Sequence, residues 1–489
     1  MLRYLFICIL IAQAGQGRGQ GRRTVIHPNT DSGYYLHPPE VYRYHPGDTL
    51  VLSARDAWTY FTVENYRGSP GRPLVIINEG GQVHMRDGIR LPNDSYVEVS
   101  GAGASGGTGG NGAGGEKYGI LIEMDPVYIS MGGGAMQIGR RSRNIDVHHL
   151  FIHHAGIGIV CETNGDCADS LDYPNWVLDS ISIHDNRIVG TWNEGMYLGN
   201  TSPDNSATSY DSRPVDCNGK TIYPMPMRNG DMRVYRNEVD STGRGGIQLA
   251  SASTGMSRIW ENTVRHCGLN GDEAQGTGIS VGTYSHVSVD HNTISDTYTW
   301  GIASLGASGT GRLVRIENNR IDSSGYLVHY RLASASKDRI DPATEPTYPD
   351  ELDWPYAIEL GTRPTLDKDS TTFSITGNAI GFYKSHVAAI QIHDAAMTIT
   401  KSGNIISDNK RVSDGATVPV YIDNTHGEIH YTDARGVAST EGRVYGRRQR
   451  LMRMALWGLC GFIVGLGLVL LVARRRRRRS RSAKAASAP

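Results

Sequence analysis

The sequence predicts an all-β fold, a right-handed parallel β-helix (solenoid), followed by one transmembrane helix near the C-terminus. Three observations predict this class. A short phrase containing asparagine recurs at a nearly even spacing, a second short apolar strand follows each copy, and residues 454–473 form an uncharged run long enough to cross a bilayer.

The recurring phrase reads apolar, two variable residues, Asn, one variable residue, apolar. Copies occur at residues 183–188, 234–239, 259–264, 289–294, 316–321 and 375–380. Successive asparagines from Asn237 to Asn319 lie 25, 30 and 27 residues apart, and Asn378 and Asn404 lie 26 apart. Such a period is typical of a solenoid with one copy per coil. We expect asparagine at a fixed corner, because it tolerates left-handed backbone and its amide can bond to the Asn of the next coil.

A second short strand, opened by a small residue, follows each copy. These strands are expected at residues 155–159, 194–198, 245–249, 277–281, 300–305, 356–360, 388–392 and 419–422. Their alternating apolar side chains run for only three to six residues, which is too short for an amphipathic helix. Two or three such strands per coil describe a parallel β-helix.

Two turns near the N-terminus carry a resemblance to a known family. Pro46-Gly47-Asp48 precedes one strand, and a Gly-Ser-Pro-Gly-Arg-Pro turn at 68–73 precedes the next. With the repeat, they make residues 40–430 resemble the pectin-lyase-like superfamily, and the entry coil resembles those of chondroitinase-B-like and alginate-lyase-like members. The resemblance implies the fold and a bias toward carbohydrates. This superfamily includes lyases, glycoside hydrolases, epimerases and non-catalytic surface proteins, so the fold does not name a reaction.

The two ends predict export and tethering. An apolar run closed by Ala12-Gln13-Ala14 is typical of a secretory signal peptide, and the arginines after residue 473 outnumber those before the apolar run, which places the C-terminus in the cytoplasm. A sorting tail that is cleaved during surface attachment is the alternative. The expected segments are a signal peptide (1–14), a linker (15–40), the β-helix (41–431), a stalk (432–453), the transmembrane helix (454–473) and a basic cytoplasmic tail (474–489).

The charge balance of the chain limits the classes of ligand that it is expected to bind. Without Arg3 and the twelve basic residues from Arg447 onward, 36 of the 49 basic residues remain against 49 acidic ones. This acidic balance disfavours nucleic acid, and an anionic polysaccharide would need local basic residues or bound calcium; no cofactor is otherwise indicated.

Four cysteines lie between the signal and the apolar run, and an even set in an oxidising compartment predicts two disulfides. Three connectivities are open, of which we favour Cys161 with Cys167 and Cys217 with Cys267. A zinc site is disfavoured, because no Cys-x-x-Cys accompanies a pair of histidines.

Candidate catalytic residues gather before the second short strand of consecutive coils, where stacking should bring the corners together at about 4.8 Å per coil. In a lyase, Arg244 would neutralise a uronate and His154 or His266 would take its proton. In a glycoside hydrolase, Glu194 and Glu273 would act as the two carboxylates. Against a lyase, the Glu-x-Glu strand and Lys base of the chondroitinase-B-like enzymes are absent from these coils.

Aligning the coils by asparagine also predicts outward columns that could hold sugars through stacking and hydrogen bonds. We assign substrate binding to Trp192, Tyr197, Gln248 and Glu359. A second outward column contains His148, His184, Tyr235, Trp260, Asp290 and Glu317. For all of these columns, plain strands that face solvent are an equally good interpretation. The pairs at 148–149 and 153–154 could ligate a metal, but such His pairs are more typical of surface residues, so no metal ligand is assigned.

Together these patterns predict an exported, membrane-tethered β-helix protein that binds polysaccharide, with cleavage by a lyase or glycoside hydrolase left open. The alternative is a non-catalytic surface adhesin or structural β-helix. A further alternative, a metal-handling β-helix, predicts bound copper or calcium.

Overall fold

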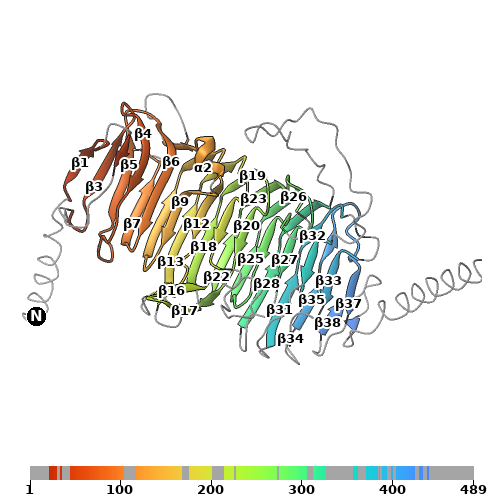
Figure 1. Ribbon diagram of the computed structural model, residues 1–489. Coiled ribbons are helices and arrows are strands. Elements are labelled where there is room, and N and C mark those ends of the chain that lie inside the picture. Colours follow the sequence, from red (N-terminus) through yellow and green to blue (C-terminus); the bar gives the residue numbers. More distant parts are fainter. Residues whose placement is uncertain are drawn as a thin grey trace, which may run out of the picture.

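The chain winds into a parallel β-helix in which each turn of the coil lies on the previous one (Figure 1). In the computed structural model, the described residues are 21–29, 33–35, 44–103, 117–130, 132–167, 176–200, 214–224, 227–272, 275–305, 312–325, 356–361, 370–383, 385, 388–393, 398–399, 404–423, 429–432 and 438–439. The predicted all-β fold and its parallel coils are confirmed.

Three series of parallel strands form three faces. The first face contains β1 (Arg23–Ile26), β3 (Thr49–Ser53), β5 (Leu74–Glu79), β7 (Ser95–Ser100), β10 (Arg143–His148), β13 (Val177–His184), β18 (Arg228–Tyr235), β22 (Ser257–Trp260), β25 (Val287–Asp290), β28 (Arg312–Glu317), β31 (Ser370–Thr376), β35 (Asn404–Ser407) and β38 (Ile429–Thr432). Each strand pairs in parallel with the next one named, so residues of neighbouring coils stand in register.

The other two faces belong to one large sheet. The second face contains β8 (Ile120–Glu123), β11 (Leu150–His153), β14 (Arg187–Val189), β19 (Glu238–Thr242), β23 (Thr263–Cys267), β26 (Thr293–Thr297), β29 (Arg320–Ser324), β32 (Ala379–Ile380) and β36 (Lys410–Arg411). The third face contains β9 (Gly134–Gly139), β12 (Ile157–Cys161), β15 (Met196–Leu198), β20 (Ile247–Leu249), β24 (Ile279–Val281), β27 (Ile302–Ser304), β30 (Ile358–Leu360), β33 (Ile390–His393) and β37 (Val420–Asp423).

The remaining elements lie at the ends and in excursions from the coils. They are β2 (Tyr34–Tyr35), β4 (Trp58–Thr62) and the long β6 (Val83–Pro92), which pairs with both β8 and β9; the hairpin of β16 (Val215–Cys217) and β17 (Lys220–Ile222); β21 (Ala252–Thr254), β34 (Thr398–Ile399), β39 (Ala438–Ser439) and the short helix α2 (Pro126–Ser130). No helix in the described part of the chain is long and apolar enough to cross a membrane.

One apolar core runs along the inside of the coils. Alternate strand residues such as Ile259, Val264 and Ile279 point inward and are fully buried, as the period of two along a strand requires. Their neighbours point outward, where they form columns with the matching residues of adjacent coils. The apolar pattern of each strand therefore decides which side chains can meet a ligand.

Buried asparagine amides join one coil to the next at the corner between the first and second faces. The side-chain Nδ2 of Asn237 donates to Oδ1 of Asn262 at 3.0 Å, and Asn262 repeats this toward Asn292 at 2.9 Å. Each Oδ1 also accepts the backbone N–H of the preceding asparagine, as in Asn237 to Asn262 at 3.0 Å. The ladder runs through Asn186, Asn237, Asn262, Asn292, Asn319, Asn378 and Asn409.

Two details of the predicted corner are wrong. The left-handed residue is the one before each asparagine, such as Glu261 at φ 54° and His291 at φ 57°. This leaves the asparagine side chain pointing inward, where its amide is buried. The last rung is Asn409 rather than Asn404, because Asn404 lies in a first-face strand and accepts the backbone N–H of Phe373.

A second corner, which we define as the turns that link second-face strands to third-face strands, uses hydroxyls instead of amides. Thr191 donates to the carbonyl of Asn193 at 3.0 Å, and Thr242 donates to that of Arg244 at 2.6 Å. The residue before each of these positions is again left-handed, including Ser241 at φ 56°. The hydroxyls thereby fix the turns in which the candidate catalytic residues lie.

The first coil begins before the predicted linker boundary at residue 41. Strand β1 pairs in parallel with β3, and β2 pairs in parallel with β4, because apolar residues in this stretch extend the two sheets by one coil. At the other end, β38 is the last parallel strand, and β39 pairs with it in the antiparallel sense. The predicted signal peptide, transmembrane helix and basic tail lie outside the described residues.

The favoured disulfide pairing is wrong. Cys167 bonds to Cys217 with a Cα–Cα distance of 5.6 Å, while Cys161 and Cys267 are free and fully buried. Cys161 ends a third-face strand on its inward side, and Cys267 stands in register with Thr242 at the second corner. The bonded pair instead joins the segment after β12 to the hairpin of β16 and β17.

Replacing Asn262 by alanine should lower the free energy of unfolding by about 2–4 kcal/mol, because buried donors and acceptors of two neighbouring coils lose their partners. Urea unfolding followed by circular dichroism measures this. Thr263→Ala, an exposed neighbour in the same coil, is the control and should change stability by less than about 0.5 kcal/mol. Equal effects of the two substitutions would contradict a stabilising amide ladder.

Burial raises the pKa of the Cys161 and Cys267 thiols to about 12, so neither thiol should react in the folded chain. Iodoacetamide should label neither cysteine before unfolding and both of them after unfolding without reductant. Peptide mass spectrometry gives the labelled positions. Labelling of Cys167 or Cys217 without reductant would exclude the bond between them.

Candidate functional site

The second corner brings together two candidates predicted from the sequence, Glu194 and Arg244, and a third charged residue, Asp272. Glu194 lies in the turn before β15, Arg244 in the next turn before β20, and Asp272 in the turn after that. The guanidinium Nη1 of Arg244 lies 3.7 Å from Glu194 Oε1, and its Nε lies 3.7 Å from Asp272 Oδ2. Stacked turns hold them there, since Gly195 N–H donates to the carbonyl of Gly245 at 3.0 Å.

Glu194 and its partners differ in exposure. Only 3% of Glu194 is exposed, whereas the side chains of Arg244 and Asp272 are 39% and 35% exposed. Burial raises the pKa of Glu194 above its ordinary value, and the nearby Arg244 charge partly opposes this. The second corner therefore presents the accessible guanidinium of Arg244 and carboxylate of Asp272 beside Glu194, an acid that holds its proton more tightly than usual.

The predicted general bases lie in other ion pairs. Nδ1 of His154 lies 3.5 Å from Oε1 of Glu123, and Nδ1 of His266 lies 2.8 Å from Oδ1 of Asp240. Asp240 also accepts from Arg265 at 2.7 Å. The structure describes no contact between either histidine and Arg244, so their roles in a lyase stay a prediction. Glu273 lies outside the described residues.

The predicted substrate-binding residues occupy two places on the same side of the molecule. Trp192 lies half-buried in the second-corner turn, where its carbonyl accepts from Asn270 at 3.1 Å. The other three stand in one outward column of the third face. That column contains Tyr197, Gln248, Ser280, Ala303, Glu359, Gln391 and Tyr421.

The middle of this third-face column is buried, although its side chains point away from the core. Gln248 is 7% exposed and Glu359 is 4% exposed, while Tyr197 near one end is half-buried. Ala303 of the column packs with Trp300 and Tyr356 in a small apolar cluster that is separate from the main core. The sequence predicted the column correctly and gave no sign that its centre is covered.

Glu359 is the most unusual group in the column. Its Oε2 has no hydrogen-bond partner, and no charged side chain compensates it within the described residues. Burial alone raises the pKa of Glu359 well above 4.5. A carboxyl in this setting is stable as the neutral acid, which can donate a hydrogen bond to a polar ligand.

The first-face column is a stack of rings. His148 stacks on His184 with centroids 4.8 Å apart, His184 on Tyr235 at 4.6 Å, and Tyr235 on Trp260 at 4.2 Å. The guanidinium of Arg258 lies over the Trp260 ring at 4.7 Å. Because the ring faces cover one another, they stabilise the coils and offer no open platform for a sugar.

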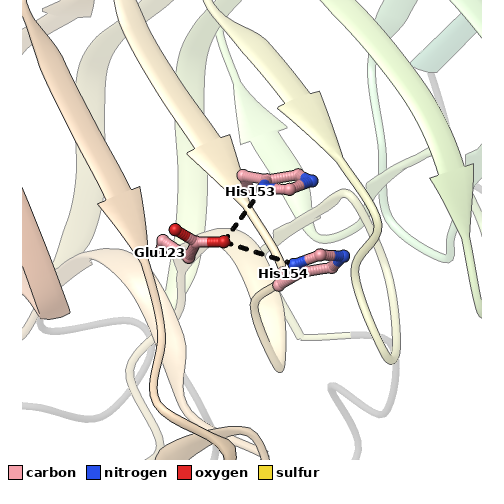
Figure 2. A group of neighbouring side chains, drawn as sticks. All are labelled: Glu123, His153 and His154. Atoms are coloured by element: carbon pink, nitrogen blue, oxygen red, sulfur yellow. Dashed lines mark hydrogen bonds and ion pairs between the residues drawn. The ribbon is translucent and has the colours of Figure 1, made fainter. Parts of the chain in front are cut away.

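Sequence reasoning missed Glu123. It stands in register with His153 on the neighbouring second-face strand, and its carboxylate contacts both His153 and His154 (Figure 2). Its coil lacks the asparagine phrase, so an alignment built on that phrase does not reach it. The available signal was the short apolar run from Ile120 to Ile122, which is typical of a strand and ends at Glu123.

No protein-family model and no curated protein sequence matches the chain at a significant level. Solved structures do match it. The strand pairing of this chain by itself shows that it is a parallel β-helix.

One similar structure is the A-module of the mannuronan C-5 epimerase AlgE4 of Azotobacter vinelandii, with 12% identity, a TM-score of 0.33, and coverage of 82% of this chain and 89% of that chain. A second is the Dettilon tailspike protein gp208, with 12% identity, a TM-score of 0.33, and coverage of 77% and 62%. A third is the PL6 family alginate lyase AlyGC, with 11% identity, a TM-score of 0.24, and coverage of 86% and 55%.

Glu359→Gln should stabilise the chain at neutral pH and leave its stability unchanged below about pH 4.5. A raised pKa means that the folded state holds the proton, so the stability from protonated Glu359 is complete at low pH and is lost as pH rises through the folded pKa. The glutamine side chain of the variant stays neutral at every pH, so the variant does not lose this stability as pH rises. The gain at pH 7.5 should be at least about 1 kcal/mol in urea unfolding.

Glu261→Gln, at an exposed first-corner position, is the control and should show no such pH-dependent gain. A Glu359→Gln chain that is equally stable or less stable than the native chain at pH 7.5 would contradict an uncompensated carboxyl.

Proposed function

We propose that the chain is an exported, membrane-tethered β-helix protein that binds polysaccharide at the edge formed by the second corner and the adjoining third face. The observation that carries the proposal is the ion-paired group of Glu194, Arg244 and Asp272, in which a buried acid orients an accessible guanidinium. Sugar hydroxyls need fixed hydrogen-bonding groups, and aromatic side chains supply apolar contact with the ring. Trp192 and Tyr197 stand in the same turn and in the strand that follows it.

The rigid coil supports this role. The turns before β15 and β20 are joined by backbone hydrogen bonds, so Glu194 and Arg244 are positioned by the fold before a ligand arrives. A site that is already ordered loses less conformational entropy on binding than one built on free side chains. Repeating coils also suit a repeating ligand, because each coil adds another rung of outward side chains.

Export and tethering rest on the two ends of the sequence and on the disulfide. The bond between Cys167 and Cys217 fits an oxidising compartment, since disulfides persist outside the cytosol. The apolar run at 454–473 and the arginines after it suit a single membrane crossing with the β-helix outside.

A second candidate function is hydrolysis of the bound polysaccharide at the same edge. The raised pKa of Glu194 suits a general acid, and Asp272, on the other side of Arg244, supplies a second carboxyl group. Hydrolysis is favoured over elimination, because a lyase needs a cation free to neutralise a uronate. Arg244 is already shared between two carboxylates.

Arg244→Gln should weaken binding to the polysaccharide that the native chain recognises by about tenfold or more, since loss of one well-placed interface group costs more than about 1.4 kcal/mol. A glycan panel probed with purified native protein identifies the ligand, and calorimetry measures the affinity. Arg236→Gln is the matched control, because Arg236 is also bonded to a carboxylate, Asp185, but on the first-face side.

Equal affinity of the Arg244→Gln and native proteins would refute binding at this edge. Glu194→Gln tests the chemistry separately by release of reducing ends and by the absorbance of an unsaturated uronate. Binding without either product supports a non-catalytic adhesin. A product from the native protein that Glu194→Gln abolishes supports catalysis, and its type decides between hydrolysis and elimination.

A further inference from the structure

Glu123, His153 and His154 place three ligand atoms around one point at the second corner (Figure 2). Oε1 of Glu123 lies 3.2 Å from Nδ1 of His153 and 3.5 Å from Nδ1 of His154. All three ligand atoms lie within 4.8 Å of one another. Both histidines direct the same ring nitrogen toward the same carboxylate oxygen.

The backbone explains why two adjacent histidines face the same way. Successive strand residues point to opposite sides, but the left-handed conformation of His154 (φ 51°) turns its side chain back beside that of His153. The two ring centroids are 3.8 Å apart and the rings are inclined by 33°. Gly190, in the next coil, leaves space, since a Cβ there would lie 3.0 Å from Cδ2 of His154.

Glu123 is fixed to both histidines by the coil. It is the register partner of His153, and the N–H of Met124 donates to the carbonyl of His154 at 3.1 Å. The three side chains remain 54%, 32% and 46% exposed for Glu123, His153 and His154, so an ion can reach them from solvent. The positions of all three residues are therefore set by the fold, and only their side-chain torsions need to adjust.

The spacing suits a small divalent ion. Ligands about 2.0–2.1 Å from a tetrahedral zinc ion lie about 3.3 Å apart, close to the two carboxylate-to-imidazole distances found here. Two imidazoles and one carboxylate are the donors that zinc and similar transition metals prefer, whereas calcium takes oxygen ligands. Three protein ligands also leave a fourth position for water.

The other group of this kind, Asp146, His148 and His184, does not suit an ion as well. The rings of His148 and His184 lie face to face, at 10°, as members of the first-face ring stack. Both nitrogens of His184 already face carboxylates, Asp146 at 3.0 Å and Asp185 at 2.6 Å. This group is explained by the first-face ring stack.

We propose that Glu123, His153 and His154 form a binding site for a divalent transition-metal ion, with one coordination position open to water. The site is independent of the polysaccharide proposal, because it uses none of the residues on which that proposal rests.

The test uses the purified full-length chain, freed of metal by a chelator, and Co²⁺ as a spectroscopic probe that Zn²⁺ displaces. The native protein should bind one Co²⁺ with the visible absorption of a four-coordinate site, and Zn²⁺ should remove that absorption. Glu123→Gln and His154→Gln should each weaken binding by at least about tenfold, since even residues outside the ligand sphere cost 10–100-fold. His291→Gln is the matched control, because His291 is also left-handed and contacts a carboxylate, but only one.

Absence of cobalt absorption in the native protein would overturn the proposal. So would absorption that survives in Glu123→Gln and disappears in His148→Gln, because the ion would then lie on the first face. Should the variants fail to fold, native protein with and without Zn²⁺ is treated with diethyl pyrocarbonate. Protection of His153 and His154 by zinc, mapped by mass spectrometry, supports the site, and equal modification overturns it.

Discussion

The register of each coil on the next is the constraint on which every outward surface of this protein depends. A left-handed residue at the first corner lets the following asparagine turn inward, and its amide then bonds to the asparagine of the adjacent coil. Side chains alternate along a strand, so a slip of one residue would exchange buried and exposed positions. The amide ladder opposes such a slip because a displaced asparagine would leave buried polar atoms without partners.

Much of the fold was readable because the same phrase repeats. Alignment by asparagine predicted the ring column from His148 to Trp260 and the column shared by Tyr197 and Glu359, and both exist. The phrase pointed to Asn404, which is followed by Ile405 and Ile406, whereas the true rung, Asn409, is followed by Lys410 and Arg411 and does not fit the phrase. Nor could the phrase show that rings in one column face each other, which depends on side-chain torsions in neighbouring coils and decides whether the column can bind a sugar.

The candidate site was less predictable than the fold, because its contacts cross between coils. The sequence grouped Glu194 with Arg244, and the structure confirms that they meet. It also grouped His154 and His266 with them, and each of these histidines contacts a carboxylate of a second-face strand, Glu123 or Asp240. The cysteines were also only partly predictable. Alternation along the strand explains why Cys161 is buried, but the bond from Cys167 to Cys217 depends on the position of the hairpin of β16 and β17, which lies outside the regular coils.

The proposed metal site and the proposed polysaccharide site lie on the same edge of the coils, and backbone hydrogen bonds show that they belong to adjacent coils. The turn that begins at Trp192 stacks on the turn that follows His154, since the N–H of Trp192 donates to the carbonyl of Ala155 at 2.8 Å. One coil step, about 4.8 Å, therefore separates the level of the histidines from that of Trp192 and Glu194. An ion held by Glu123 and the histidines would add positive charge beside an edge where Arg244 is shared by two carboxylates. In a chain whose acidic residues outnumber its basic ones before the C-terminal tail, that charge would favour a polyanionic ligand over a neutral one.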